Sequence, residues 1–398
     1  AALCSDRIRR PLTSGGAGDG PVGDRTSGNH NERVDGHGGQ MFDWVTQGRL
    51  PAAAVTIGTA ATVVLAGLAG TGSPAKSLDF RQAGHWVYRH TLGSVFHVDG
   101  GTKQVDAKAD VGVFDADVNG ARVLQGDTQG FVLGPTGALV FGKSTLTVDT
   151  TIAVGSGEDP IGLEVRGGPY LVYRNHGTIM RLGVPPTTVQ VGGPVAGAVG
   201  TDEGSVWVQR ADTGDLCFVG RDDDSLQCPA RVQPGHKGSL TAVGKNPAYV
   251  DVEQGTLTPL DEEKGFGQPV RLGVTVPADV AIAANAAGDR LPLLDRLRDV
   301  LVLADVSWVG RAARNVSAPI TVDLPRGEFD PPVATADAVA LLDRVHRRLY
   351  TFDSRGRQRA RTRLPGAGVG VRVSRGEDGR VYVDDRTGAN TVVVEDVQ

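Results

Sequence analysis

One pattern recurs along most of this chain: an apolar strand, a short polar turn that usually contains glycine, and a second apolar strand. "VWVQRADTGDLCFVG", residues 206–220, is one copy, and seven others share its form. The turn positions are Gly93, Gly137, Gly177, Gly214, Gly255, Asp299, Arg347 and Gly388. Their spacing averages about 42 residues, which is the period of four-stranded propeller blades.

The segments around each hairpin predict two further strands per repeat. "VAGAVGTDEG" precedes the copy at 206–220, and "SLQCPARV" follows it. The 56 glycines among 398 residues also favour many tight turns, because glycine adopts positive φ at little cost. We therefore predict an all-β propeller over residues 77–398, with eight blades and seven as the alternative. "SLDF", Ser77 to Phe80, could complete the first blade and close the ring, leaving no open sheet edge.

The first 49 residues do not resemble the repeats. Residues 1–40 are rich in Gly, Asp, Asn and Arg and have no apolar period, so we predict that they are disordered. Met41 follows them and has the character of a natural start, which makes residues 1–40 an upstream extension. Residues 41–49 form a short flank before an apolar segment.

Residues 50–70 contain no charged side chain and are long enough, as a helix, to cross a bilayer. We expect a transmembrane anchor, with a signal sequence cleaved near Ala69 as the alternative. Residues 71–76 would link this helix to the propeller. Charges flank the segment on both sides and do not decide its orientation. We expect the propeller outside the cytoplasm, on the cell membrane if the helix is kept and secreted if it is cleaved.

Two of the three cysteines, Cys217 and Cys228, flank a strand, a charged turn and a second strand. They could face each other across a hairpin and form a disulfide in an oxidising compartment. Two reduced, half-buried thiols are the alternative. No cysteine or histidine spacing in the chain suggests zinc.

The sequence "DADVNG" places oxygen ligands at the first, third and fifth positions of a loop, as a calcium site does. These residues are Asp115, Asp117 and Asn119. Glycine stands at the twelfth position, where calcium loops carry a bidentate glutamate. We therefore prefer a turn at the end of a strand and expect no metal or other cofactor.

"RGRQRARTR" alternates arginine with other residues, so in a strand all five guanidinium groups would lie on one face. The five are Arg355, Arg357, Arg359, Arg361 and Arg363. They could form an edge that binds sulfate, phosphate or carboxylate groups of a polyanion. We prefer the simpler interpretation, an outer strand whose charges prevent pairing with other chains.

No triad, P-loop or dinucleotide motif indicates a reaction. The net charge of −5 gives no general attraction to nucleic acid, and none is expected as a partner. For an enzyme, carboxylates such as Asp202 and Glu203 would have to converge on the ring axis.

Two repeats resemble those of quinoprotein-like propellers, which carry Asp-x-x-Thr-Gly and in which the aspartate and threonine tie the turn to the strand. "DDRTGANTV" matches with Asp384, Thr387 and Gly388, and has Val392 in place of a tryptophan. The order of an apolar segment, "TGSPAKS" and the first repeats also resembles anchored or secreted surface proteins of actinobacteria, in which a propeller often precedes a fibronectin type III module. That resemblance implies a place at the cell envelope.

These observations predict a membrane-tethered, extracytoplasmic propeller that serves as a binding platform for an envelope protein or a cell-wall polymer. The membrane contact would be residues 50–70. A propeller enzyme acting on glycans or other surface polymers is the alternative, and a sensor facing the cytoplasm is a third hypothesis.

Overall fold

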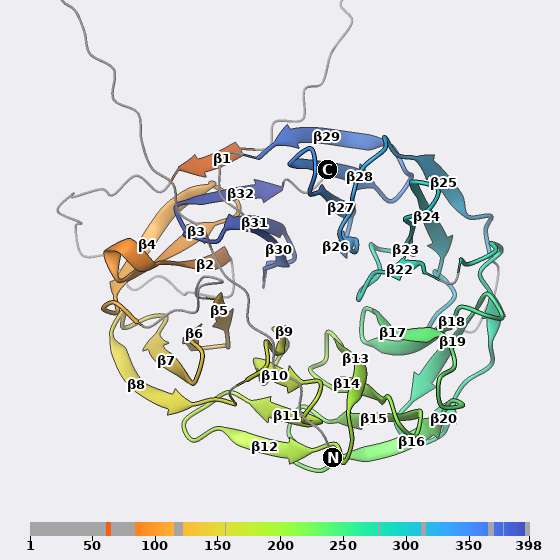
Figure 1. Ribbon diagram of the computed structural model, residues 1–398, viewed down its shortest axis with the longest axis horizontal. Helices are drawn as coiled ribbons and strands as arrows, with labels where there is room; N and C mark the ends of the chain where they lie inside the picture. Colours follow the sequence, from red (N-terminus) through yellow and green to blue (C-terminus); the bar gives the residue numbers. More distant parts are fainter. Residues whose placement is uncertain are drawn as a thin grey trace, which may run out of the picture. The chain divides into compact units, whose positions relative to one another are not determined.

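The computed structural model describes residues 61–64, 84–114, 122–155, 157–277, 279–311, 316–364, 370–376 and 378–394. They belong to the second of two compact units, Thr56–Gln398. Eight antiparallel sheets follow one another around a ring (Figure 1). The predicted all-β propeller of eight blades is therefore confirmed, and the alternative of seven blades is wrong.

We number the blades from the strand at residue 84 and give the strands of each in chain order. Blade 1 contains β2 (Gly84–Arg89), β3 (Ser94–Asp99) and β4 (Gln104–Asp110); blade 2 contains β5 (Arg122–Gln125), β6 (Gln129–Leu133), β7 (Gly137–Gly142) and β8 (Val148–Ala153); blade 3 contains β9 (Ile161–Leu163), β10 (Tyr170–Tyr173), β11 (Thr178–Arg181) and β12 (Thr187–Gln190); blade 4 contains β13 (Val195–Gly200), β14 (Val206–Arg210), β15 (Asp215–Val219) and β16 (Gln227–Arg231).

The second half of the ring repeats this order. Blade 5 contains β17 (Gly238–Val243), β18 (Asn246–Asp251), β19 (Thr256–Asp261), β20 (Gly265–Phe266) and β21 (Val270–Arg271); blade 6 contains β22 (Ala281–Ile282), β23 (Arg290–Asp295), β24 (Val300–Asp305) and β25 (Ile320–Asp323); blade 7 contains β26 (Val333–Ala334), β27 (Ala338–Asp343), β28 (Arg348–Asp353) and β29 (Gln358–Arg363); blade 8 contains β30 (Val371–Arg375), β31 (Val381–Asp385) and β32 (Asn390–Val394).

A strand from the start of the chain completes blade 8. β1 (Ala61–Val64) pairs antiparallel with β32, with Ala61 opposite Val393 and Val64 opposite Asn390. Figure 1 shows β1 on the outside of β32. The ring is closed, as we expected, but by residues 61–64. Ser77–Phe80, which we expected to close it, lies outside the described residues.

The predicted helix over residues 50–70 is not supported. Its four described residues, 61–64, form strand β1, because three of them are the β-prone run Thr-Val-Val and the edge of β32 can accept them. The described ranges contain no helix with the length and apolarity needed to span a bilayer. The rest of that segment, the predicted disordered region 1–40 and residues 71–76 lie outside the described residues.

The predicted turn positions are where the backbone becomes left-handed. Five of the glycines have φ between 56° and 74°, namely Gly93, Gly177, Gly214, Gly255 and Gly388. Asp299 and Arg347, which replace glycine in blades 6 and 7, still have φ of 55° and 52°. Gly137 differs, since it is already the first residue of β7. The turn geometry therefore persists even where the side chain makes it unfavourable.

Aspartates at the ends of strands bind the backbone of the turns that follow. Asp251, Asp295 and Asp343 end the second strands of blades 5, 6 and 7, and each accepts a hydrogen bond from a backbone N–H two or three residues later. Asp385 does the same in blade 8, for the N–H groups of Thr387 and Ala389. These carboxylates fix the turns between the second and third strands of their blades.

Candidate functional site

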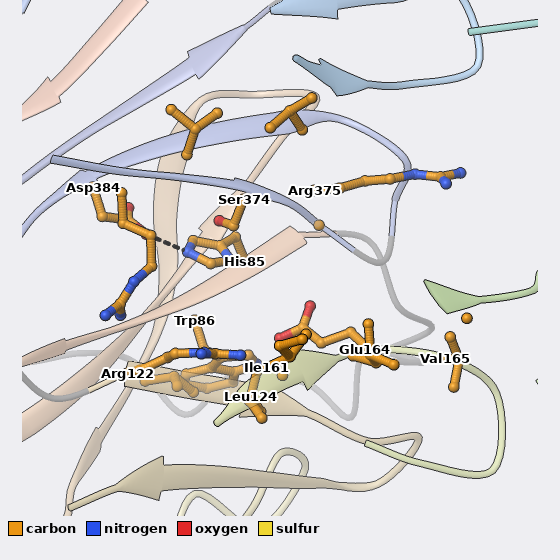
Figure 2. Close-up of a pocket in the computed structure, with 18 of the residues that line it drawn as sticks. His85, Trp86, Arg122, Leu124, Ile161, Glu164, Val165, Ser374, Arg375 and Asp384 are labelled. Carbon is orange, nitrogen blue, oxygen red and sulfur yellow. Dashed lines mark hydrogen bonds and ion pairs between the residues drawn. The ribbon is translucent and has the colours of Figure 1, made fainter. Parts of the chain in front are cut away.

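A cavity of about 750 Å³ lies at the centre of the ring. Residues of the inner strands β5, β9, β13 and β30 and of β2 in blade 1 line it. Figure 1 shows these strands on the inner side of their blades. Charged side chains from several blades line this cavity (Figure 2). Its size is within the range that holds a small ligand or part of a larger one.

A buried His–Asp pair joins the first and last blades in the wall of the cavity. His85 Nε2 on β2 lies 2.7 Å from Asp384 Oδ2 on β31, and the imidazole stacks on the ring of Tyr382 at 4.7 Å. Asp384 Oδ1 accepts a hydrogen bond from Thr391 Oγ1 at 2.8 Å. Burial alone would lower the pKa of His85, but Asp384, with help from Glu164 and Asp378, outweighs it and raises this pKa.

This pair corrects one sequence assignment. The Asp-x-x-Thr-Gly resemblance gave Asp384 the role of tying the turn to the strand. In the structure Asp385 has that role, because it accepts hydrogen bonds from the backbone and hydroxyl of Thr387. Neighbouring residues of a strand point to opposite faces, so Asp384 turns toward the cavity and His85.

Two arginines on inner strands face the same cavity. Arg122 begins β5, and its Nη1 donates a hydrogen bond to the carbonyl oxygen of Pro160 at 3.2 Å. Burial, with repulsion by Arg372, lowers the pKa of Arg122 to about 10. Arg372 lies on β30, where burial also lowers its pKa. Both groups remain charged at neutral pH.

Glu164 and Asp202 bring carboxylates to the cavity from blades 3 and 4. Glu164 Oε1 accepts a hydrogen bond from the backbone N–H of Gln125 at 3.1 Å. Asp202 Oδ1 lies 3.9 Å from Nη1 of Arg375, so this ion pair joins blade 4 to blade 8. Glu203, the other carboxylate expected on the axis, instead pairs with Lys245 at 3.2 Å.

The cysteines lie on adjacent strands of blade 4. Cys217 on β15 and Cys228 on β16 are joined by a disulfide, with 3.9 Å between their Cα atoms. The β15–β16 pairing has a register shift between Leu216 and Phe218, and this irregularity lies at Cys217. Of the two alternatives from the sequence, the structure contains the bridge.

The arginine edge is only partly formed. β29 begins at Gln358, so Arg355 and Arg357 precede the strand and the expected alternation holds only from Arg359 onward. Arg357 and Arg359 both bind the carboxylate of Asp353, at 2.8 and 2.6 Å. The guanidinium of Arg361 lies over the ring of Tyr350, 5.5 Å from its centre, and Arg363 ends the strand. Only Arg359, Arg361 and Arg363 therefore lie within the strand, and a register shift interrupts its pairing with β28. Binding of a polyanion by this edge stays a prediction.

The calcium candidates Asp115, Asp117 and Asn119 lie outside the described residues. Within the described ranges, no group of three or more His, Cys, Asp or Glu side chains is placed to hold a metal ion.

Sequence reasoning missed His85, Arg122, Glu164 and Arg372 as members of one site. They come from four blades that are far apart in the chain, so no local motif contains them. A weak indication was available in "VRVSR", residues 371–375, because two arginines in an inner strand have no simple packing role.

No family model and no curated protein matches the chain. Solved structures share its fold. BamB from Moraxella catarrhalis is 15% identical with a TM-score of 0.53, over 84% of this chain and 96% of that one. A catalytically inactive virginiamycin B lyase from Staphylococcus aureus with quinupristin is 9% identical with a TM-score of 0.51, over 71% and 98%. Dihydro-heme d1 dehydrogenase NirN is 13% identical with a TM-score of 0.50, over 86% and 78%. At these identities the likeness establishes the β-propeller fold alone.

Proposed function

We propose that this protein is a ligand-binding propeller of the cell envelope and that its ligand lies in the central cavity. The observation that carries the proposal is the set of charged side chains that different blades direct into one cavity of about 750 Å³. Such a convergence of polar groups in a concave site is typical of ligand binding. The ligand would be an envelope protein segment or a piece of a cell-wall polymer.

The disulfide between Cys217 and Cys228 supports a location outside the cytoplasm, because disulfides persist mainly in oxidising compartments. Membrane attachment through residues 50–70 is a separate question. Residues 61–64 cannot be strand β1 and part of a spanning helix at the same time. Cleavage near Ala69 would remove β1 altogether. We therefore propose an extracytoplasmic propeller that retains β1. Release of the protein from membranes without detergent would support this arrangement. A requirement for detergent would favour a transmembrane anchor over residues 50–70.

Site-specific crosslinking tests the proposed binding site. A photoreactive amino acid at Val373, which lines the cavity, should capture a molecule from the cell envelope, detected as a heavier protein by mass spectrometry. The control is the same amino acid at Val148, exposed on the outer strand β8. Adducts at Val148 alone, or at both positions equally, would contradict binding in the cavity.

An enzyme acting on glycans or other surface polymers is the second candidate. The specific observation in its favour is that the His85–Asp384 pair and Glu164 line the same cavity. Groups of this kind can exchange protons with a bound substrate. If the protein is an enzyme, wild type should release soluble fragments from envelope polymers, whereas Glu164→Gln should not. Binding without release by wild type would leave only the first proposal.

A further inference from the structure

We propose that Arg122 and Arg372 together bind an oxyanion group, a carboxylate or a phosphate, of the ligand in the central cavity. This inference rests on the proposed binding function and specifies the chemistry of that site. Guanidinium groups recognise such anions because their planar array of donors matches two oxygen atoms at once.

The two arginines lie on either side of blade 1. Arg122 begins the inner strand of blade 2, and Arg372 lies on the inner strand of blade 8. Both line the cavity, and Arg372 repels Arg122 directly, as the lowered pKa of Arg122 reflects. Two like charges in a partly buried site repel each other, and an anion between them would remove that repulsion.

Arg372 has no hydrogen-bond or ion-pair partner among the residues that the structure describes. Among the described residues, none of the Arg372 nitrogens is a buried atom without a partner, so its donors face the solvent of the cavity and are open to a ligand acceptor. An anion in the cavity would supply the acceptors that the protein does not.

The neighbouring carboxylates are largely occupied by other partners. Asp384 binds His85 with one oxygen and Thr391 with the other. Glu164 accepts the backbone N–H of Gln125. Asp159 is exposed and is not part of the cavity lining. These acids moderate the positive potential without closing the space between the arginines.

The position of Arg122 depends on a glycine. A Cβ atom on Gly162 would lie 1.5 Å from Nη2 of Arg122, so the guanidinium occupies space that only glycine leaves free. The hydrogen bond to Pro160 holds the group from the other side. Arg122 is therefore oriented before any ligand arrives, which reduces the entropy lost on binding.

A single oxyanion fills only a small part of about 750 Å³. We infer that the anion is one group of a larger ligand and that the rest of the ligand contacts the other walls. A carboxylate would belong to a peptide or an acidic sugar, and a phosphate to a phosphorylated polymer or lipid headgroup.

Calorimetric titration tests this chemistry with two probes, inorganic phosphate and succinate. Wild type should bind at least one of them saturably in the millimolar range, and the preferred probe distinguishes phosphate from carboxylate ligands. Arg372→Gln should weaken binding about tenfold, which corresponds to about 1.4 kcal/mol. Its circular dichroism and melting curve without probe should match those of wild type.

Gly162→Ala is the more discriminating variant because it keeps both charges and acts mainly by displacing Arg122; Leu124 Cδ2, 2.9 Å from the added Cβ, must shift as well. It should weaken binding several-fold. Gly197→Ala is its matched control, since no atom lies within 4 Å of the added Cβ. Arg363→Gln, on the outer strand β29, is the control for loss of a charge. Both controls should bind as wild type does.

Absence of saturable binding by wild type, or wild-type binding by Arg372→Gln, would overturn the oxyanion site. Neither result would affect crosslinking at Val373, which captures a ligand of any charge. Failure of this inference and failure of the proposed function are therefore separate outcomes.

Discussion

His85 and Asp384 form the most consequential contact at the scale of single residues, because this pair holds the first blade against the last. The folded protein raises the pKa of His85 above its usual 6.5, so folding favours the protonated imidazole. The stability that this group contributes is present in full below the unfolded pKa. It is lost as the pH rises through the folded pKa.

We therefore predict that His85→Gln destabilises the protein more at low pH than at high pH. Between about pH 5.5 and pH 8.5, the loss in unfolding free energy should shrink by about 1 kcal/mol. Urea unfolding of wild type and His85→Gln across this pH range measures the change in this loss. In an Asp384→Asn background burial becomes the dominant cause and lowers the pKa of His85, so the loss should no longer be greater at low pH. A loss that is constant with pH in the wild-type background would contradict the assignment.

At position 214 the backbone conformation and the space around it require glycine. Its φ is 74°, and a Cβ would lie 2.1 Å from the carbonyl oxygen of Val232. Gly214→Ala should lower the free energy of unfolding by at least about 2 kcal/mol, through left-handed strain and this contact. Gly197→Ala, with an ordinary φ and open space, should change it by less than about 0.5 kcal/mol in the same denaturant titration. Equal effects would show that the turn can rearrange.

At the scale of elements, the β15–β16 hairpin is closed by a covalent bond. Cys217 is buried and Cys228 is exposed, so Cys228→Ser removes the bridge with little disturbance of the core. A loop of this length predicts a loss of about 2–3 kcal/mol in unfolding free energy. Chemical denaturation with and without reductant measures it. Reductant should lower the unfolding free energy of wild type and leave that of Cys228→Ser unchanged. A wild type that is insensitive to reductant would mean that Cys217 and Cys228 are free thiols.

The pairing of β1 with β32 is the second element with a testable role. A chain that begins at Leu65 lacks β1 and leaves the edge of β32 unpaired, which invites association with other chains. We expect it to melt at a lower temperature than a chain that begins at Thr56 and to form oligomers in light-scattering measurements. A monomer of unchanged melting temperature would show that β1 does not contribute to closure.

The elements also show what sequence patterns can predict. The hairpins were predictable because both strands and the turn lie within about 15 residues, and because a left-handed turn position favours glycine, which can be recognised in the sequence. β1 was assigned to a helix because an uncharged run of Ala, Val and Leu fits a membrane span as well as a buried strand. Whether this run becomes a helix or a strand depends on β32, a partner strand more than 300 residues further along the chain.

The whole ring explains why the site was not predictable. His85, Arg122, Glu164 and Arg372 meet only because the inner strands of several blades share one axis. The number of blades followed from the repeat, but which face of each inner strand turns toward the axis depends on the register of every sheet. The arginines that the sequence made conspicuous lie instead on the outer strand β29 or just before it, far from this cavity in the order of strands.

Asp202 of blade 4 and Arg375 of blade 8 form an ion pair across the cavity, with 3.9 Å between Oδ1 of Asp202 and Nη1 of Arg375. Both are partly exposed, so the pair should contribute less than about 1 kcal/mol to stability. Asp202→Asn should therefore leave the melting temperature almost unchanged. It removes a negative charge from the cavity and frees Arg375, so phosphate or succinate should bind about two- to threefold more tightly, in calorimetry at low salt. Glu203→Gln, one residue along and paired with Lys245 outside the cavity, is the control that should not change affinity. Weaker binding by Asp202→Asn would mean that the ion pair shapes the cavity more than it opposes the anion.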